Sequence, residues 1–167
     1  MTDLELVGPH HVTVGYVGTP GARTFFLQAQ DEDLLVSFKL EKAQVQGIAD
    51  LLSQLLTQLG DGPATDWDRA AMALRDPVEA RWPAGELALG FDEERERFLL
   101  EVAERAEDEG RAQAHLWFDR DQARRLAAEA LAILAEGRPA CQLCGRPLDT
   151  GQDHVCPATN GHGRLSR

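Results

Sequence analysis

Long apolar runs are missing from this 167-residue sequence, and basic residues are few. No apolar stretch approaches the roughly 20 residues that a membrane-spanning helix needs, so we expect no contact with a membrane. Acidic residues outnumber Lys and Arg by 28 to 17, which leaves a net charge of −11. A surface of this charge repels phosphate backbones and argues against nucleic acid as a partner.

Targeting and catalytic signatures are also missing. The N-terminus, Met1-Thr2-Asp3-Leu4-Glu5, is acidic and lacks the basic start of a secretory signal. There is no P-loop, no G-x-G-x-x-G motif and no serine in a nucleophile elbow. The sequence therefore predicts a cytoplasmic protein, and it indicates neither catalytic residues nor a site for an organic cofactor.

Cysteines number only three, yet all lie near the end of the chain in the pattern C-x2-C-x9-H-x-C, formed by Cys141, Cys144, His154 and Cys156. Thiolate sulfur and imidazole nitrogen are preferred ligands of Zn²⁺, and four of them complete a tetrahedral structural site. In a reducing compartment such a cluster favours a metal over disulfides. We therefore predict a structural zinc ion held by these four residues.

The sequence also permits other interpretations of the cysteine cluster. Cys141 and Cys144 also form a C-x-x-C pair typical of redox proteins, although Gly145 and Pro147 disfavour the helix that normally follows it. A catalytic zinc with one of the four residues not bound, or three ordinary thiols in a flexible tail, are further alternatives.

The sequence before the cysteine motif has the pattern of an α+β domain in which one unit of secondary structure occurs twice. Each unit has three strand-like segments followed by an amphipathic helix, over Glu41–Leu59 in the first copy and Asp119–Glu136 in the second. Capping-box residues begin both helices, and Gly60 and Gly137 follow them as expected left-handed C-caps. We predict a mainly antiparallel sheet with both helices on one face.

One segment of the second unit is ambiguous. Residues 92–110 have apolar spacing that also fits a helix, and their Glu and Arg residues favour one. We predict a strand over 97–103, because the internal repeat requires it.

These patterns divide the chain into two parts. Residues 1–136 form the duplicated domain, with one repeat at about 11–60, a connector at 61–83 and a second repeat at about 84–136. Residues 137–167 form a zinc ribbon-like element and tail. Outside the cysteine motif, His10 and His11 are expected at the surface, and Arg23 ends a glycine-rich hairpin turn that could bind an anion.

Four stretches of the sequence resemble an uncharacterised actinobacterial family, a domain of unknown function sometimes labelled "repeat protein". They are VGTPGARTFFLQA (17–29), LEKAQV (40–45), LALGFD (87–92) and CQLCGRPLD…HVCPATNG (141–161). The resemblance implies that the four metal-ligand candidates belong together, and it favours a strand at 97–103. It implies no activity.

Together these observations predict a zinc-binding protein of unknown activity. We expect a non-enzymatic binding or scaffold module whose partner is another protein or a small ligand. The alternative is an enzyme or enzyme subunit with its active site at the junction of the two repeats.

Overall fold

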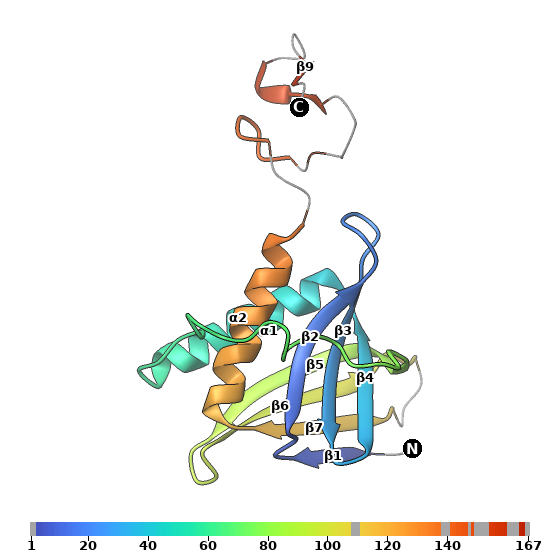
Figure 1. Ribbon diagram of the computed structural model, residues 1–167, viewed down its shortest axis with the longest axis vertical. Coiled ribbons are helices and arrows are strands. Elements are labelled where there is room, and N and C mark those ends of the chain that lie inside the picture. The colour runs from blue at the N-terminus through green and yellow to red at the C-terminus, as the bar shows by residue number, and fades with distance from the viewer. Residues whose placement is uncertain are drawn as a thin grey trace.

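The computed structural model describes residues 3–107, 111–137, 141–146, 148, 154–159 and 164–165 (Figure 1). Its helices and strands are β1 Leu4–Val7, β2 His11–Val17, β3 Thr24–Asp31, β4 Leu34–Leu40, α1 Lys42–Gln58, β5 Ala80–Asp92, β6 Arg97–Glu104, β7 Gln113–Phe118, α2 Arg120–Ala135, β8 His154–Val155, a 3₁₀ turn Pro157–Thr159 and β9 Arg164–Leu165.

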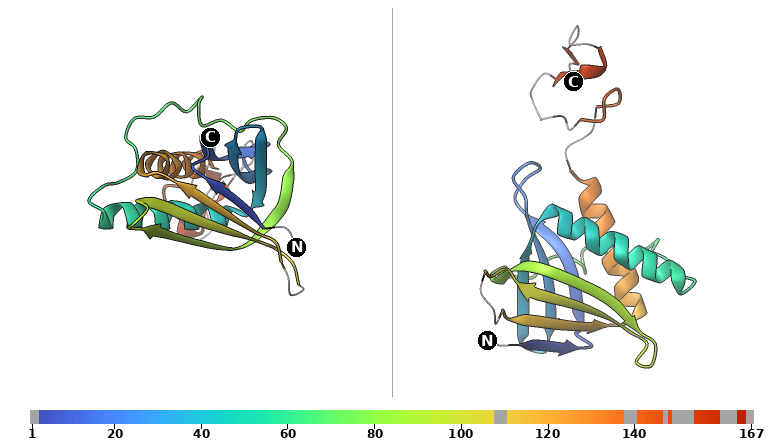
Figure 2. Two further views of the ribbon diagram at one scale, coloured as in Figure 1. Left: turned by 90° about the horizontal axis from the view of Figure 1, so that it is seen from below. Right: turned by 180° about the vertical axis from the view of Figure 1, so that it is seen from behind.

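Seven strands form one mixed sheet in the order β1-β7-β6-β5-β4-β3-β2. Four neighbouring pairs are antiparallel, whereas β1 pairs with β7 and β4 pairs with β5 in parallel. The sheet curls around α1 and α2, which lie side by side in its concave face (Figure 2). The α+β class is therefore confirmed, and the sheet is mainly antiparallel as predicted.

The structure differs from the sequence prediction in two places. The first strand of the sheet, β1, was not predicted, because its four residues form their backbone hydrogen bonds with β7, more than 100 residues away. The predicted connector 61–83 is too long at its end, since β5 already begins at Ala80. Pro83 lies inside β5, near the point where this strand leaves β4 and pairs with β6.

Both helices begin at the predicted residues. Glu41 and Asp119 are the N-caps, and each forms a capping box with the third helical residue, Gln44 or Gln122. Gly60 has the predicted left-handed conformation, with φ +76°. Gly137 does not. At that end of α2, the Arg23 guanidinium instead donates to the carbonyl of Ile133 (2.7 Å).

The ambiguous segment is a strand. β6 spans Arg97–Glu104 and pairs on both sides, with β5 and with β7. Within β6, the Glu and Arg residues lie at the ends of the strand or on its outer face, while Phe98, Leu100 and Val102 alternate into the core. Tertiary pairing therefore outweighs intrinsic propensity here.

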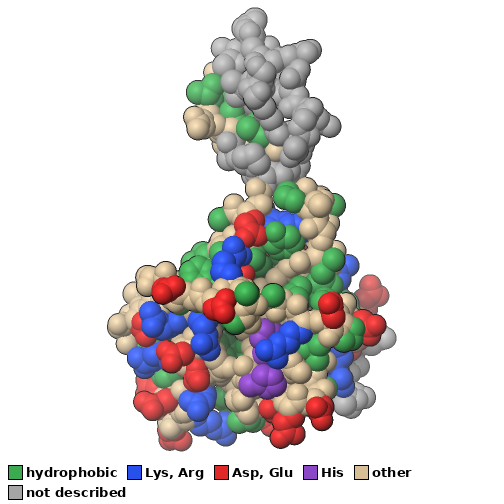
Figure 3. Space-filling model, in the orientation of Figure 1, with side chains coloured by type: hydrophobic (Ala, Val, Ile, Leu, Met, Phe, Trp, Pro, Cys, Tyr) green, Lys and Arg blue, Asp and Glu red, His purple; other side chains and the backbone are tan. Residues whose placement is uncertain are grey.

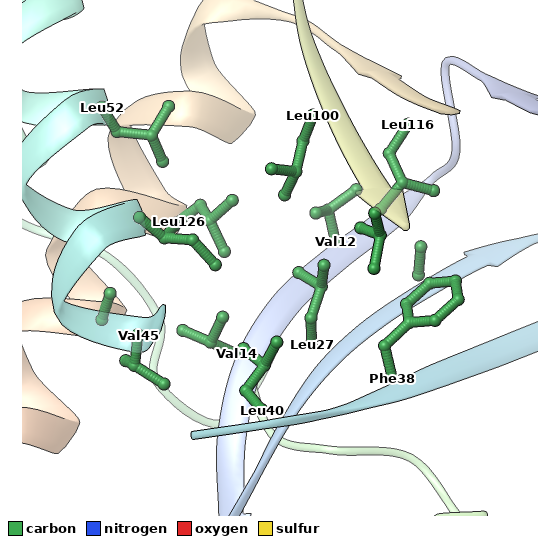
Figure 4. Packing of buried hydrophobic residues seen from close by; sticks show 14 of the residues in the cluster. Val12, Val14, Leu27, Phe38, Leu40, Val45, Leu52, Leu100, Leu116 and Leu126 are labelled. Atoms are coloured by element: carbon green, nitrogen blue, oxygen red, sulfur yellow. The ribbon is translucent and has the colours of Figure 1, made fainter. Parts of the chain in front are cut away.

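A single apolar cluster joins the sheet to both helices. Side chains from β2, β3, β4, β6, β7 and both helices converge on the same interior in Figure 4. Phe38, Phe98 and Phe118 are fully buried, and Phe98 stacks on Phe118 with 5.9 Å between the ring centroids. Neither half of the chain buries its helix alone, because α2 packs on β2 and α1 packs on β5.

The part of the chain that precedes the cysteines, here called the body, has two halves, β2–α1 and β5–α2, and their strand registers match. Leu27 faces Phe38 across β3 and β4, and Leu100 faces Leu116 across β6 and β7. The capping glutamines also match. The side chain of Gln122 donates to the carbonyl of Pro9, just before β2, and that of Gln44 donates to the carbonyls of Ala84 and Gly85, in the corresponding part of β5.

The chain between α1 and β5 runs as a strap over β2, β3 and α2. Arg69 pairs with the buried Glu129 (2.9 Å) and with Glu136 (2.6 Å), and Trp67 donates to Glu129 (2.7 Å). The Gln28 side chain exchanges hydrogen bonds with the backbone of Arg75. These contacts fix the strap where it forms one wall of a cavity over β2.

Candidate metal centre

The first two cysteines form a tight turn at Cys141–Gly145. The backbone N–H of Gly145 donates to the carbonyl of Cys141, and the N–H of Cys141 donates to the carbonyl of Arg146, both at 2.8 Å. Gly145 has φ +73°, a conformation in which a side chain would be strained. This is the local geometry expected of a zinc knuckle, since it turns two cysteines that are separated by two residues toward one point.

The structure brings the third cysteine to the same point. The Sγ atoms of Cys141, Cys144 and Cys156 all lie within 4.8 Å of one another, and those of Cys141 and Cys156 are 3.8 Å apart. With a Zn–S distance of about 2.3 Å, the edge of a tetrahedral site is also about 3.8 Å. A disulfide requires about 2.05 Å, so the three cysteines form no disulfide and lie about as far apart as the ligands of one metal ion.

The thiols differ in their protonation. The backbone of Cys144 hydrogen-bonds the sulfur of Cys141 and lowers the pKa of Cys141 to about 6. Burial raises the pKa of Cys156, and the backbone of Ala158 partly opposes this. Cys141 thus has the thiolate character that metal ligation uses.

His154 was predicted as the fourth ligand. Its backbone belongs to β8, which pairs with β9 through His154 and Leu165. An extended strand directs alternate residues to one side, so this backbone agrees with the H-x-C half of the motif. The side chain of His154 lies outside the part of the chain that the structure describes, so its ligation stays a prediction.

Among the described residues, the three cysteines are the only group of His, Cys, Asp or Glu side chains close enough to hold a metal ion. Within the described part of the chain, the acidic residues of the second half form no group that could hold a metal ion. The sequence motif therefore identified the one described place where ligand atoms converge.

Arg23 lines a cavity of about 390 Å³ together with Lys39 and Lys42. Its guanidinium lies over the rings of Tyr16 and Phe25, 4.8 Å from each centroid, and binds the C-terminal end of α2. The two lysines are exposed. Arg23 is thus mainly a cap for α2, and we assign no site to this cavity.

His11 was expected at the surface, and this is wrong. Its side chain is only 4% exposed, because it lies on the outer face of β2 beneath the strap. Thr13, two residues further along this strand, is likewise buried and donates to the carbonyl of Met72 in the strap. The sequence signal was there, since residues two apart on a strand share a face, but nothing local predicted that the strap would cover that face.

Burial lowers the pKa of His11 to about 4, and Arg75 and His10 add to the effect while Gln28 opposes it. Asp68 and Arg125 also face this cavity. In the unfolded chain the imidazole titrates near 6.5, so below that pH the unfolded state takes up a proton that the folded state does not. We expect this to lower the free energy of unfolding by about 2 kcal/mol between pH 7.5 and pH 5.

Urea unfolding at the two pH values measures this effect, with His11→Phe as the comparison. The variant should lose about 2 kcal/mol less stability on acidification than the wild type does. Equal losses in the two proteins would show that His11 does not cause the pH dependence.

The structure therefore defines an α+β protein with a mixed seven-stranded sheet and a cluster of three cysteines capable of holding a metal. The chain belongs to the family described as a protein of unknown function, DUF3090, which matches residues 5–156. The match includes both halves of the body and ends at the last cysteine. No curated protein and no solved structure matched the chain. No helix in the described segments is long and apolar enough to cross a membrane.

Proposed function

We propose that this is a cytoplasmic protein with a structural Zn²⁺ bound by Cys141, Cys144, His154 and Cys156. The observation that supports this most directly is the 3.8 Å separation of two thiol sulfurs within a three-cysteine cluster, which equals a tetrahedral Zn–S edge. Cysteines that cluster without forming a disulfide are also typical of a reducing compartment.

The donor set favours a structural over a catalytic role. Three thiolates and one imidazole fill a tetrahedral shell and leave no position for a reactive water. The surrounding elements are short, because β8 and β9 have two residues each. A ribbon of this size gains its stability from the metal rather than from a core of its own.

We infer that the body arose by duplication of a strand–strand–strand–helix unit. The matching registers of the two halves and the matching contacts of Gln44 and Gln122 support this. In this reading the body is a non-enzymatic binding or scaffold module for a protein or small ligand, and the zinc element is attached to it.

An enzyme with its active site at the junction of the halves is the second candidate. It is favoured by a cavity of about 210 Å³, where β2 from the first half meets α2 from the second. A converted substrate bound there would support it, whereas a ligand that dissociates unchanged supports the binding module.

Elemental analysis of the full chain, purified without added metal, tests the zinc proposal. We expect about one zinc per chain, and a thiol reagent should titrate the three cysteines only after a chelator is added. A zinc content far below one would contradict the proposal. Fewer than three titratable thiols in the denatured, chelated protein would instead indicate a redox disulfide.

A further inference from the structure

The cavity over β2 has properties that neither the fold nor the metal centre explains. It lies where the start of β2, the first turns of α2 and the strap meet, and its volume is about 210 Å³. Its polar lining consists of His10, His11, Asp68, Arg75, Gln122 and Arg125. On the face shown in Figure 3, histidine and Lys/Arg side chains lie next to one another at the centre.

His11 supplies a buried polar atom that lacks a partner. Its Nε2 is buried and forms no hydrogen bond with any described residue. An unpaired buried polar atom is unfavourable and rare in folded proteins, so something that hydrogen-bonds is expected beside it. The cavity that His11 lines provides the space.

Two guanidinium groups at this cavity have no carboxylate partner. Arg75 contacts the side chains of Gln30 and His10, neither of which carries a negative charge there. Arg125 forms no hydrogen bond or ion pair with any other described residue. The one carboxylate in the lining, Asp68, accepts a hydrogen bond from the backbone N–H of Ala70. Positive charge therefore exceeds negative charge in this cavity, although the chain as a whole has a net charge of −11.

A metal ion does not suit the same lining. The side chains of His10, His11 and Asp68 do not form a ligand cluster in the described structure, where the cysteines alone do so. Two arginines would also repel a cation. The charge of the cavity instead fits an anion, and guanidinium groups bind phosphate and carboxylate oxygens through paired hydrogen bonds.

The other half of the body provides an internal comparison. By the matched registers, Gly47 occupies the place of Arg125, and Glu86 that of His11. The corresponding cavity, of about 150 Å³, is lined mainly by apolar residues such as Ile48, Leu87 and Leu89. The fold therefore does not require the arginine and the histidine, since its other half forms without them.

We propose that the cavity over β2 binds the phosphate group of a small metabolite, with Arg75 and Arg125 holding the charge and His11 Nε2 hydrogen-bonding to a phosphate oxygen. A monohydrogen phosphate offers both an O–H and bare oxygens, so it can pair with either neutral tautomer of His11. The proposal names the ligand class for the binding role proposed above and rests on that role, but it does not depend on zinc.

Titration of the full-length, metal-loaded protein with inorganic phosphate tests the site, followed by amide and imidazole NMR signals at constant ionic strength. We expect saturable shifts at His11 and in the first turns of α2. Arg125→Gln should weaken phosphate binding about tenfold or more, because it removes a charge-assisted hydrogen bond. The matched control is Arg120→Gln, which makes the same charge change on an exposed residue of the same helix outside the cavity, and it should keep the affinity within about twofold.

Three outcomes would overturn the proposal. One is the absence of saturable shifts at millimolar phosphate, and another is equal weakening by both substitutions, which would indicate general charge attraction. Acetate binding as tightly as phosphate would identify a carboxylate site instead. Zinc content measured on the same samples separates the proposals, because phosphate binding without zinc contradicts only the metal assignment, and zinc without phosphate binding contradicts only this one.

Discussion

Replacing Cys144 with serine should release the bound metal and unfold the C-terminal element while the body stays folded. The substitution removes one of the three sulfurs that lie within 4.8 Å of one another and puts a weak oxygen donor in its place. Binding free energy is folding free energy for a segment of this size, so its described parts, residues 141–146 and 154–159, should lose their structure with the metal. We expect the zinc content to fall from about one per chain to near zero, with rapid proteolysis confined to this segment.

Leu143→Ser provides the matched control. Leu143 lies in the same knuckle between the two cysteines, but its side chain is 60% exposed and carries no ligand atom. This variant should keep its zinc and its resistance to protease. Full metal occupancy in Cys144→Ser would show that the ligand assignment is wrong. Unfolding of the whole protein would show that the division between body and C-terminal element is wrong.

Local sequence signals predicted the helices well because their determinants lie within a few residues. The capping boxes at Glu41 and Asp119 fixed where α1 and α2 begin, and apolar spacing fixed which face they bury. The cysteine motif was predictable for the same reason, since three of its four members converge as their spacing indicated.

What the sequence did not reveal depends on distant segments. The pairing of β1 with β7 joins residues more than 100 positions apart, and no local pattern encodes it. The place of Pro83 within β5 depends on β4 as a neighbour. Likewise, His11 is buried and shares a cavity with Arg75 and Arg125 because the strap covers this part of β2. The periodicity of a sequence predicts which residues share one face of a strand or helix, but it does not predict which distant segment covers that face.

The second large effect is expected from Phe38→Ala, at the joint between the two halves. Phe38 is fully buried in β4 and pairs across the parallel ladder with Trp82 of β5, with 5.0 Å between the ring centroids. Removing a buried phenyl ring forfeits its burial and leaves a cavity, which typically costs about 3–5 kcal/mol. Because total stabilities are about 5–15 kcal/mol, this would be a large share of the folding free energy.

The way in which the variant unfolds is as informative as the size of the effect. Phe38 belongs to an apolar cluster that both halves share, and each helix packs on a strand of the other half. We therefore expect one cooperative transition in urea, with amides of β2–β4 and β5–β7 losing protection from hydrogen exchange at the same denaturant concentration. The control Leu34→Ala, on the same strand but 39% exposed, should cost less than about 1 kcal/mol. If Phe38→Ala instead unfolded β2–β4 while β5–β7 stayed protected, the halves would be separate folding units. The body would then be a pair of domains, and the cavity between β2 and α2 would be an interface between them rather than a preformed site.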